Sequence, residues 1–287
     1  MKERVKLLLA ALGRVLPRTT KLRLARRSTA LGHLLLEDGD VEIDDYLGSL
    51  RVRVNARNVI ERLMLTGDYE PGVAAVVRRR VRSGDTCVDV GANVGPVALL
   101  LCQRAAPSGR VFCFEPGHAY AERLRANLAL NPELAGVAEV LELGISDQKG
   151  ELHWKEDAEH PGNAWLLSPD GVPVPVTTLD DFVAERGVDR LDFLKIDTEG
   201  MELEVLTGAR RCLARFHPVV LFESLMEFEA ARGAPIRERT QKLLLDLDYR
   251  LYAFDRKGRL TATAYPRFPA NTLALWEPAG ASPAGDG

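Results

Sequence analysis

The chain has 287 residues, of which 46% are hydrophobic and 28% are charged, as in an average soluble globular protein. This composition excludes disorder, a collagen-like repeat and a membrane bundle as descriptions of the whole chain. The formal net charge is −3, yet residues 1–27 hold nine basic residues and one acid, Glu3. Residues 28–287 therefore hold 29 basic and 40 acidic residues, a balance of −11, which argues against a nucleic-acid binder.

The N-terminal segment combines apolar and basic residues. Residues 5–16 place apolar side chains at helical spacing, which predicts a basic amphipathic helix. This helix either docks on the surface of its own domain, which we favour, or contacts an anionic membrane or a partner. Arg14 and Arg18 interrupt the apolar run, so a signal peptide is not expected. No run approaches the about 20 apolar residues that cross a bilayer.

Residues 1–80 are expected to form an N-terminal extension that caps the substrate side of the protein. Within it, residues 50–54 read as a short strand, and the turn at residues 66–72 leads into a helix over residues 73–81. The four cysteines of the chain show no metal-site spacing, so we expect buried thiols in a cytoplasmic protein.

From residue 84 onward, short apolar strands alternate with helices. The predicted strands cover residues 86–90, 110–114, 138–143, 191–196 and 219–222. The predicted helices cover residues 97–105, 119–130 and 201–213. This alternation predicts a doubly wound α/β domain over residues 81–277, with a mostly parallel sheet and helices on both faces. Its ligand is expected beyond the carboxyl ends of the strands.

Two segments depart from the alternation. Residues 151–177 carry Trp154 and Trp165 with no helical pattern, and they predict an inserted hairpin or loop over the strand ends. The aromatic residues of this insertion suit a sugar or ring acceptor. Residues 278–287, rich in Pro, Ala and Gly, read as a disordered tail.

The most informative motif is a glycine loop after the first of these strands. Asp89 stands two residues before Gly91, and the pattern Gly91-x-Asn93-x-Gly95 opens a helix at Pro96. Glycine allows the backbone to approach a ligand closely, so the loop predicts a nucleotide-like group. The Asp89 carboxylate either faces a positively charged group, such as the amino end of S-adenosylmethionine, or caps the N–H groups of its own loop.

An acid at the end of the next strand supports the same site. Glu115 follows the strand over residues 110–114, where a carboxylate can accept both hydroxyls of a ribose. The two signals together predict a nucleoside site. A dinucleotide-binding loop would want glycine where this chain has Asn93 and Pro96, and the Gly-Lys-Ser/Thr of a P-loop is absent.

Four segments, in this order and spacing, resemble the FkbM-type S-adenosylmethionine-dependent methyltransferases. They are Val88-Asp89-Val90-Gly91-Ala92-Asn93-Val94-Gly95, Phe114-Glu115-Pro116, Ser146-Asp147 and Leu191-Asp192-Phe193-Leu194-Lys195-Ile196-Asp197-Thr198-Glu199-Gly200. The resemblance covers about residues 60–225 and implies a Rossmann-like class I methyltransferase sheet of seven strands. One strand is inserted antiparallel near the C-terminus, and residues 271–276 are the candidate. The family commonly has histidine where this chain has Met201, so any role of that histidine is in doubt here.

The resemblance also implies a cofactor site for S-adenosylmethionine. The glycine-loop residues would surround the methionine portion, Glu115 would hold the ribose, Ser146 and Asp147 would edge the adenine, and Asp197 would lie beside the methyl group. The candidate cofactor-binding residues are therefore Asp89, Gly91, Asn93, Gly95, Glu115, Ser146, Asp147 and Asp197.

Methyl transfer to oxygen requires alignment of the acceptor and loss of its proton. Asp197 is the first candidate for the base or orienting acceptor and Glu199 the second, although both can instead cap the helix that follows. His153 and His160 in the insertion are alternative bases. A divalent metal that lowers the pKa of the acceptor hydroxyl is an alternative, with Asp197, Glu199 and Glu223 at predicted strand ends as oxygen ligands. No motif fixes such a site, and we assign no metal.

The resemblance implies O-methylation of a hydroxyl on a sugar, a polyketide or a similar specialised metabolite, with no nucleic-acid partner and no stable membrane insertion. The oligomeric state is open. Two rival functions are a nicotinamide-dependent oxidoreductase and a non-catalytic interaction protein with a vestigial nucleoside site. Asn93 and the absence of a Tyr-x-x-x-Lys pair disfavour the oxidoreductase, and the intact acids at the strand ends disfavour the interaction protein.

Overall fold

The computed structural model describes residues 20, 24, 40–55, 58–156, 164–166, 170–232 and 234–278. The expected helix over residues 5–16, the alternative base His160 and all of the expected tail except Pro278 lie outside these residues. Within the described part of the chain, no helix is long and apolar enough to cross a membrane.

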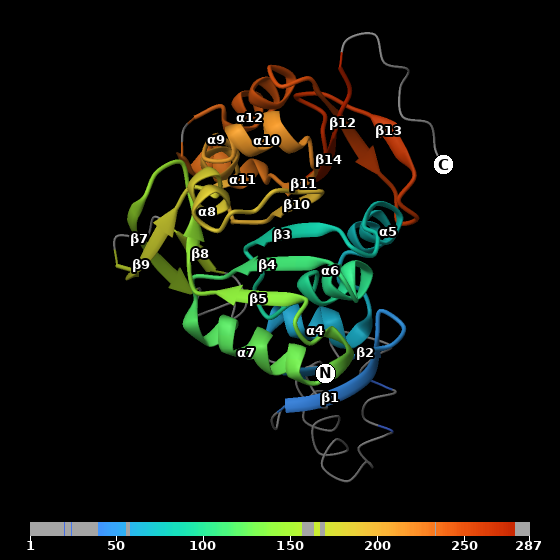
Figure 1. Ribbon diagram of the computed structural model, residues 1–287. Coiled ribbons are helices and arrows are strands. Elements are labelled where there is room, and N and C mark those ends of the chain that lie inside the picture. Colours follow the sequence, from blue (N-terminus) through green and yellow to red (C-terminus); the bar gives the residue numbers. More distant parts are fainter. Residues whose placement is uncertain are drawn as a thin grey trace, which may run out of the picture.

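An eight-stranded sheet forms the centre of the described structure (Figure 1). Its strands, in chain order, are β3 (Thr86–Val90), β4 (Arg110–Phe114), β5 (Ala138–Leu141), β10 (Phe193–Ile196), β11 (Val219–Glu223), β12 (Tyr249–Phe254), β13 (Leu260–Ala262) and β14 (Asn271–Trp276). Their order across the sheet is β13-β12-β14-β11-β10-β3-β4-β5, and the five strands from β11 to β5 are parallel. The predicted doubly wound sheet is confirmed.

The C-terminal part of the sheet also follows the resemblance, with one strand more than expected. β14 lies antiparallel between β11 and β12. The additional strand β13 pairs with the edge of β12 because the chain reverses at Asp255. The Asp255 carboxylate accepts hydrogen bonds from the backbone N–H groups of Lys257 and Arg259, at 2.8 and 3.0 Å, which stabilises this turn.

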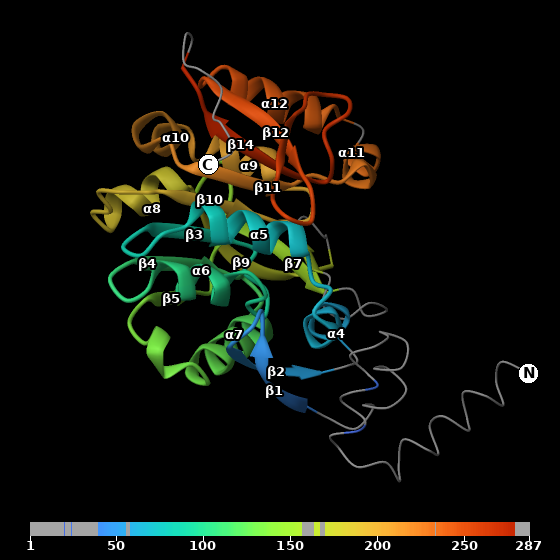
Figure 2. The same ribbon diagram turned by 90° about the vertical axis from the view of Figure 1, so that its right-hand side faces the viewer.

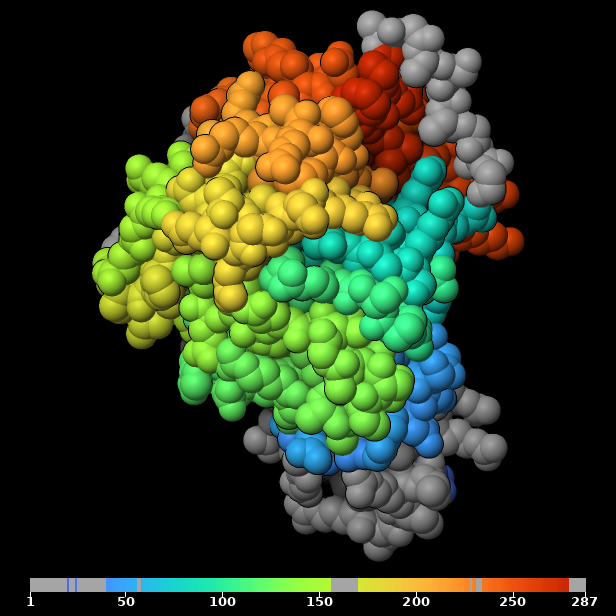
Figure 3. All heavy atoms as spheres, viewed as in Figure 1, coloured from blue at the N-terminus to red at the C-terminus, as the bar shows by residue number. Residues whose placement is uncertain are grey.

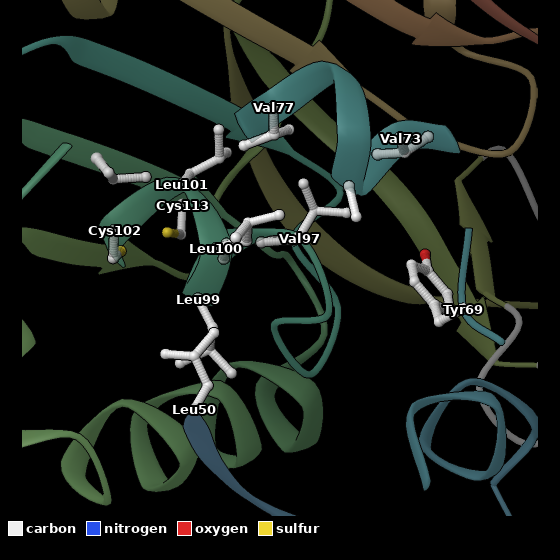
Figure 4. Packing of buried hydrophobic residues seen from close by; sticks show 14 of the residues in the cluster. Leu50, Tyr69, Val73, Val77, Val97, Leu99, Leu100, Leu101, Cys102 and Cys113 are labelled. Atoms are coloured by element: carbon white, nitrogen blue, oxygen red, sulfur yellow. The ribbon is translucent and has the colours of Figure 1, made fainter. Parts of the chain in front are cut away.

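Helices cover both faces of the sheet. One face carries α5 (Pro71–Arg80), α6 (Ala98–Ala105) and α7 (His118–Ala129), followed by the short helix η1 (Pro132–Leu134). The other carries α8 (Leu179–Glu185), α9 (Glu202–Thr207), α10 (Arg210–Phe216) and α12 (Ile236–Leu245). Each face has its own apolar cluster. In the first, Val73 and Val77 of α5 pack near Leu100 and Leu101 of α6 (Figure 4). All four cysteines are free and buried, as expected.

The extension contributes to the same core. Strands β1 (Asp40–Tyr46) and β2 (Leu50–Asn55) form an antiparallel hairpin that leads to α4 (Val59–Thr66). The side chain of Asn131 bonds both backbone groups of Arg51, and Asn127 Oδ1 accepts from the Arg53 N–H at 2.8 Å. The hairpin therefore lies against α7, and the two surfaces are continuous in Figure 3.

Residues 144–177 form a second sheet of four strands, which begins before the hairpin or loop expected over residues 151–177. These are β6 (Gly144–Ile145), β7 (Gly150–Glu156), β8 (Ala164–Leu166) and β9 (Val172–Thr177), in the order β6-β9-β7-β8. Because successive side chains of a strand point to opposite faces, Leu152 and Trp154 of β7 pack inward, whereas His153 between them is exposed. Figure 2 shows α4, β7 and α11 (Met226–Arg232) along one side of the sheet.

Candidate active site

A cleft of about 690 Å³ opens at the carboxyl ends of β3, β4 and β10. This is the edge at which open α/β sheets bind their ligands. The cleft is lined by Ile60, Tyr69, Val90, Gly91, Asn93, Phe114, Glu115, Pro116, Tyr120, Leu143, Gly144, Ile145, Trp154, Asp197, Thr198 and Glu199. Four of the eight candidate cofactor residues therefore face one cavity, together with the catalytic candidate Glu199.

The glycine loop forms one wall of the cleft. Gly91 has φ 78°, and a Cβ there would lie 1.8 Å from the Asp197 carbonyl oxygen, so only glycine allows β3 to pass this close to the segment after β10. Gly95 allows close packing against α7 and does not line the cleft. A Cβ there would lie 2.5 Å from Leu124 of α7.

Glu115 lies at the end of β4 with both carboxylate oxygens held by the backbone. One oxygen accepts from Asn93 N–H and the other from Gly117 N–H, each at 2.8 Å. Burial raises the pKa of Glu115 to about 7, against the opposing effect of these hydrogen bonds. The carboxylate keeps further lone pairs for a ligand in the cleft.

Two aromatic side chains lie over this carboxylate. A Cβ on Gly117 would lie 2.5 Å from Trp154 Cζ2, 2.9 Å from a Tyr120 ring carbon and 3.0 Å from a Glu115 oxygen. Trp154 and Tyr120 meet edge to face with ring centroids 5.8 Å apart. Trp154 thus lines the Glu115 end of the cleft, where a nucleoside is expected, and not an acceptor pocket apart from it.

Lys195 of β10 lies between the carboxylates of Asp89 and Asp197. Its Nζ lies 3.2 Å from Asp89 and 3.3 Å from Asp197, and it contacts the Gly91 carbonyl oxygen at 3.3 Å. Asp89 is fully buried and lies outside the cleft lining. The expectation that Asp89 faces a positively charged ligand is therefore corrected: β3 and β10 pair with Asp89 opposite Lys195, so the lysine provides the positive charge.

Carboxylates gather at the opposite end of the cleft. β10 and β11 run in register, so Asp197 and Glu223 follow paired residues. Glu223 in turn pairs with Asn271 of β14, whose side chain donates to Glu70 at 2.6 Å. Burial, and then the nearby Asp197, raise the pKa of Glu223, and the same two causes raise the pKa of Glu199 to about 8. Burial and the crowding of like charges therefore favour the protonated forms of Glu199 and Glu223. Of these carboxyl groups, Asp197 and Glu199 line the cleft, whereas Glu70 and Glu223 do not.

Neither Asp197 nor Glu199 caps the helix that follows. α9 begins at Glu202, whose carboxylate accepts from Thr198 N–H and Gly200 N–H, each at 3.1 Å. Glu202 therefore holds the turn that presents Asp197 and Glu199 to the cleft. Glu199 lies just before the start of α9, and burial raises its pKa despite this position near a helix N-terminus.

Comparison with known proteins identifies the family of the chain. The sequence profile of the methyltransferase FkbM domain matches residues 89–251, which is more than half of the chain. The chain belongs to the FkbM methyltransferase family. The resemblance on which the sequence interpretation relied is thus confirmed.

Similar curated proteins carry methyltransferase names. The chain is 32% identical over 154 residues to methyltransferase sdnD of Sordaria araneosa, which covers 42% of this chain and 59% of that protein. It is 29% identical over 153 residues to 2-O-methyltransferase NoeI of Sinorhizobium fredii, covering 45% and 58%. It is 28% identical over 153 residues to hexuronic acid methyltransferase AglP of Haloferax volcanii, covering 53% and 61%. The matches therefore span about three fifths of each relative.

Three residues singled out from the FkbM motifs or the insertion lie outside the cleft. Ser146 is buried and Asp147 exposed, and both line a neighbouring hollow, while Leu143, Gly144 and Ile145 reach the cleft from the same connection. His153 is exposed on the outer face of β7 and also lies outside the lining.

Several residues in or near the candidate site were not singled out as binding or catalytic residues in the sequence. Lys195 had a usable signal, because a lysine inside an apolar strand must be paired when it is buried. Side chains alternate between the two faces of β7, so the choice between Trp154 and His153 as a site residue requires knowing which face points inward. Glu223 was considered from its predicted strand end only as a metal ligand. It meets Asn271 through strand pairing, and Asn271 in turn donates to Glu70, which no local pattern specifies.

Proposed function

We propose that the protein transfers a methyl group from S-adenosylmethionine to a hydroxyl oxygen of a small molecule. The observation that carries the proposal is the meeting, in one cleft, of the glycine loop, a ribose-type acid at Glu115 and the Asp197 carboxylate. Family membership supports the same reaction type. The name of NoeI supports oxygen as the methyl-accepting atom.

The residues present suit this cofactor. Glu115 is fixed by two N–H groups and keeps lone pairs for the ribose hydroxyls, and Trp154 with Tyr120 provides an aromatic wall beside it. Gly91 and Asn93 would line the methionine portion. When bound, S-adenosylmethionine supplies an electrophilic methyl group on its sulfonium sulfur.

Asp197 is the residue proposed to assist the acceptor. Its carboxylate lines the cleft and is paired with Lys195, which compensates the negative charges of Asp89 and Asp197 together. In this position Asp197 would accept the hydrogen bond of the acceptor hydroxyl, orient its oxygen and take its proton during transfer. Glu199, with its pKa raised to about 8, is largely protonated at neutral pH and is better suited to donating a hydrogen bond.

A sugar or specialised-metabolite hydroxyl remains the proposed acceptor. Tyr69 also lines the cleft, and Asp197 is one of its neighbours. An aromatic ring and a carboxylate suit the apolar face and the hydroxyls of a sugar. The name of AglP, a hexuronic acid methyltransferase, supports a sugar acceptor. Calorimetry with S-adenosylmethionine, S-adenosylhomocysteine and NAD tests the proposal against its two rivals, a nicotinamide-dependent oxidoreductase and a non-catalytic protein with a vestigial nucleoside site. Binding of NAD alone, or of none of the three, would reject it.

No described group of three or more His, Cys, Asp or Glu side chains is arranged to hold a metal ion. A metal-assisted step therefore has no residues assigned to it. Turnover measured with and without a chelator tests for one directly.

Replacing Glu115 with Ala is expected to weaken S-adenosylhomocysteine binding at least about tenfold. The change removes acceptors for two hydrogen bonds to a carboxylate, each of which contributes about 1.5–3 kcal/mol. Calorimetry measures the affinity, and a melting curve shows whether the variant is folded. A folded variant with unchanged affinity for S-adenosylhomocysteine would show that the nucleoside binds elsewhere.

The pH dependence of binding provides a second test of Glu115. Its pKa is raised to about 7, so the carboxylate gains a proton as the pH falls through 7 and then accepts fewer hydrogen bonds. Affinity is therefore expected to be highest above pH 7 and to fall below it. Glu115→Gln should abolish this step, because the amide does not titrate there.

Replacing Trp154 with Ala is expected to lower S-adenosylhomocysteine affinity by about three- to tenfold through loss of the aromatic wall. His153→Ala is the matched control, because this neighbour lies on the outer face of the same strand. Ligand binding should also change the tryptophan fluorescence of the protein. This change should disappear in Trp154→Phe and persist in Trp276→Phe; the opposite pattern would contradict the placement.

A further inference from the structure

A second hollow lies outside the cleft, at the N-terminus of α12. It measures about 750 Å³, opens to solvent and lies between α11, α12 and the segment that precedes β14. We call it the α12 pocket, and its lining residues are Met226, Glu229, Ala230, Ala234, Pro235, Arg237, Tyr265 and Pro266. None of these residues lines the cleft.

The α12 pocket contains a buried arginine whose charge is poorly compensated. Arg237 is the second residue of α12 and is only 4% exposed. Its guanidinium donates through Nη2 to the Phe268 carbonyl oxygen and stacks on the Phe268 ring, 4.2 Å from the centroid. Its Nε has no hydrogen-bond partner, and no described carboxylate forms an ion pair with it. An arginine buried in this way is costly unless an anion accompanies it.

The start of α12 adds to the same positive potential. Its N-cap residue, Pro235, provides no side-chain hydrogen bond, so the first N–H groups of this ten-residue helix lack a side-chain cap. A helix N-terminus favours negative charge, and Arg237 lies within the first turn. The guanidinium and the N-terminus of α12 therefore both attract an anion.

The remaining walls of the α12 pocket are mainly apolar. Met226 is 70% exposed and Tyr265 is 38% exposed, which makes them two of the most exposed large apolar side chains of the described structure. Together with Pro235 and Pro266 they provide contact surface for an apolar group. Glu229 is the one carboxylate in the lining, and it would oppose an incoming anion.

We infer that the α12 pocket binds a small molecule that carries an anionic group, a carboxylate or a phosphate, on an apolar body. The anion would meet Arg237 at the start of α12, and the apolar body would contact Met226 and Tyr265. This site is separate from the cofactor cleft and does not depend on the proposed methyl transfer. The alternative is that Arg237 is purely structural: it holds Phe268 against α12, and Glu229 compensates its positive charge.

Binding of simple probes to the full chain separates these two roles. Titrations followed by calorimetry or ligand-observed NMR would use benzoate, phenyl phosphate and uncharged benzyl alcohol. We expect the anionic probes to bind with dissociation constants of about 10 mM or tighter, and benzyl alcohol to bind more weakly. Absence of binding by both anions at that concentration, or equal binding of benzyl alcohol, overturns the inference. The stronger of the two anions identifies the carboxylate or phosphate source.

Three variants complete the test. Arg237→Gln keeps a donor for Phe268 but removes the charge, and should weaken anion binding at least about tenfold. Arg239→Gln, a matched change at an exposed position of the same helix, should leave binding unchanged. Glu229→Gln should strengthen anion binding, because it removes the opposing charge. If Glu229→Gln binds no more tightly than the unmodified protein, or if Arg237→Gln folds and binds normally, the arginine is structural. Should Arg237→Gln fail to fold, the Glu229→Gln result still decides.

Discussion

Asp197→Asn is expected to lower methyl-transfer turnover by a factor of about 10² to 10⁴, with little change in S-adenosylhomocysteine affinity. Asparagine keeps the shape of the side chain and part of its hydrogen bonding, but it cannot take up the proton of the acceptor. The Lys195 ammonium retains Asp89 at 3.2 Å, so the strand pairing beneath the site should persist. Turnover at saturating substrate and calorimetry of the product cofactor measure the two effects separately.

Glu199→Gln is the matched control for that experiment. Burial and the nearby Asp197 raise the pKa of Glu199 to about 8, so at pH 7 this residue is mostly protonated and glutamine resembles its prevailing form. We therefore expect a much smaller loss of turnover than for Asp197→Asn. If Glu199→Gln is the more damaging change, or if His153→Ala abolishes turnover while Asp197→Asn does not, the base has been assigned to the wrong residue.

Gly91→Ala is expected to destabilise the protein by about 3 kcal/mol or more and to abolish cofactor binding. The added Cβ would lie 1.8 Å from the Asp197 carbonyl oxygen, at a residue with φ 78°. Either β3 or the segment after β10 must then move, and both line the cleft. Chemical denaturation measures the stability, and calorimetry measures the binding.

Gly187→Ala separates the contact at Gly91 from the general effect of a positive φ. Gly187 has φ 60°, and a Cβ there meets nothing within 4 Å, so alanine should destabilise by roughly 1 kcal/mol. Equal losses at the two positions would show that backbone conformation alone accounts for the Gly91 effect. The short contact between a Gly91 Cβ and the Asp197 carbonyl oxygen would then not explain the effect.

Local patterns in the sequence were sufficient to predict the doubly wound sheet and the glycine loop at its edge. Apolar strands alternating with helices specify a sheet buried on both faces. A glycine loop and an acid at neighbouring strand ends must meet at one edge of such a sheet, and Asn93 and Glu115 do meet there, at 2.8 Å. Asn271–Trp276 was placed correctly from the resemblance.

The side chains that complete the candidate site come together through tertiary contacts that no local pattern specifies. Lys195 neutralises Asp89 because two parallel strands, far apart in the chain, pair in one particular register, and no local pattern specifies that register. In β7, a shift of one residue would exchange the positions of Trp154 and His153, since neighbouring side chains of a strand face opposite ways. The pKa of Glu199 likewise follows from burial in the assembled cleft, which outweighs the position of Glu199 near the start of a helix.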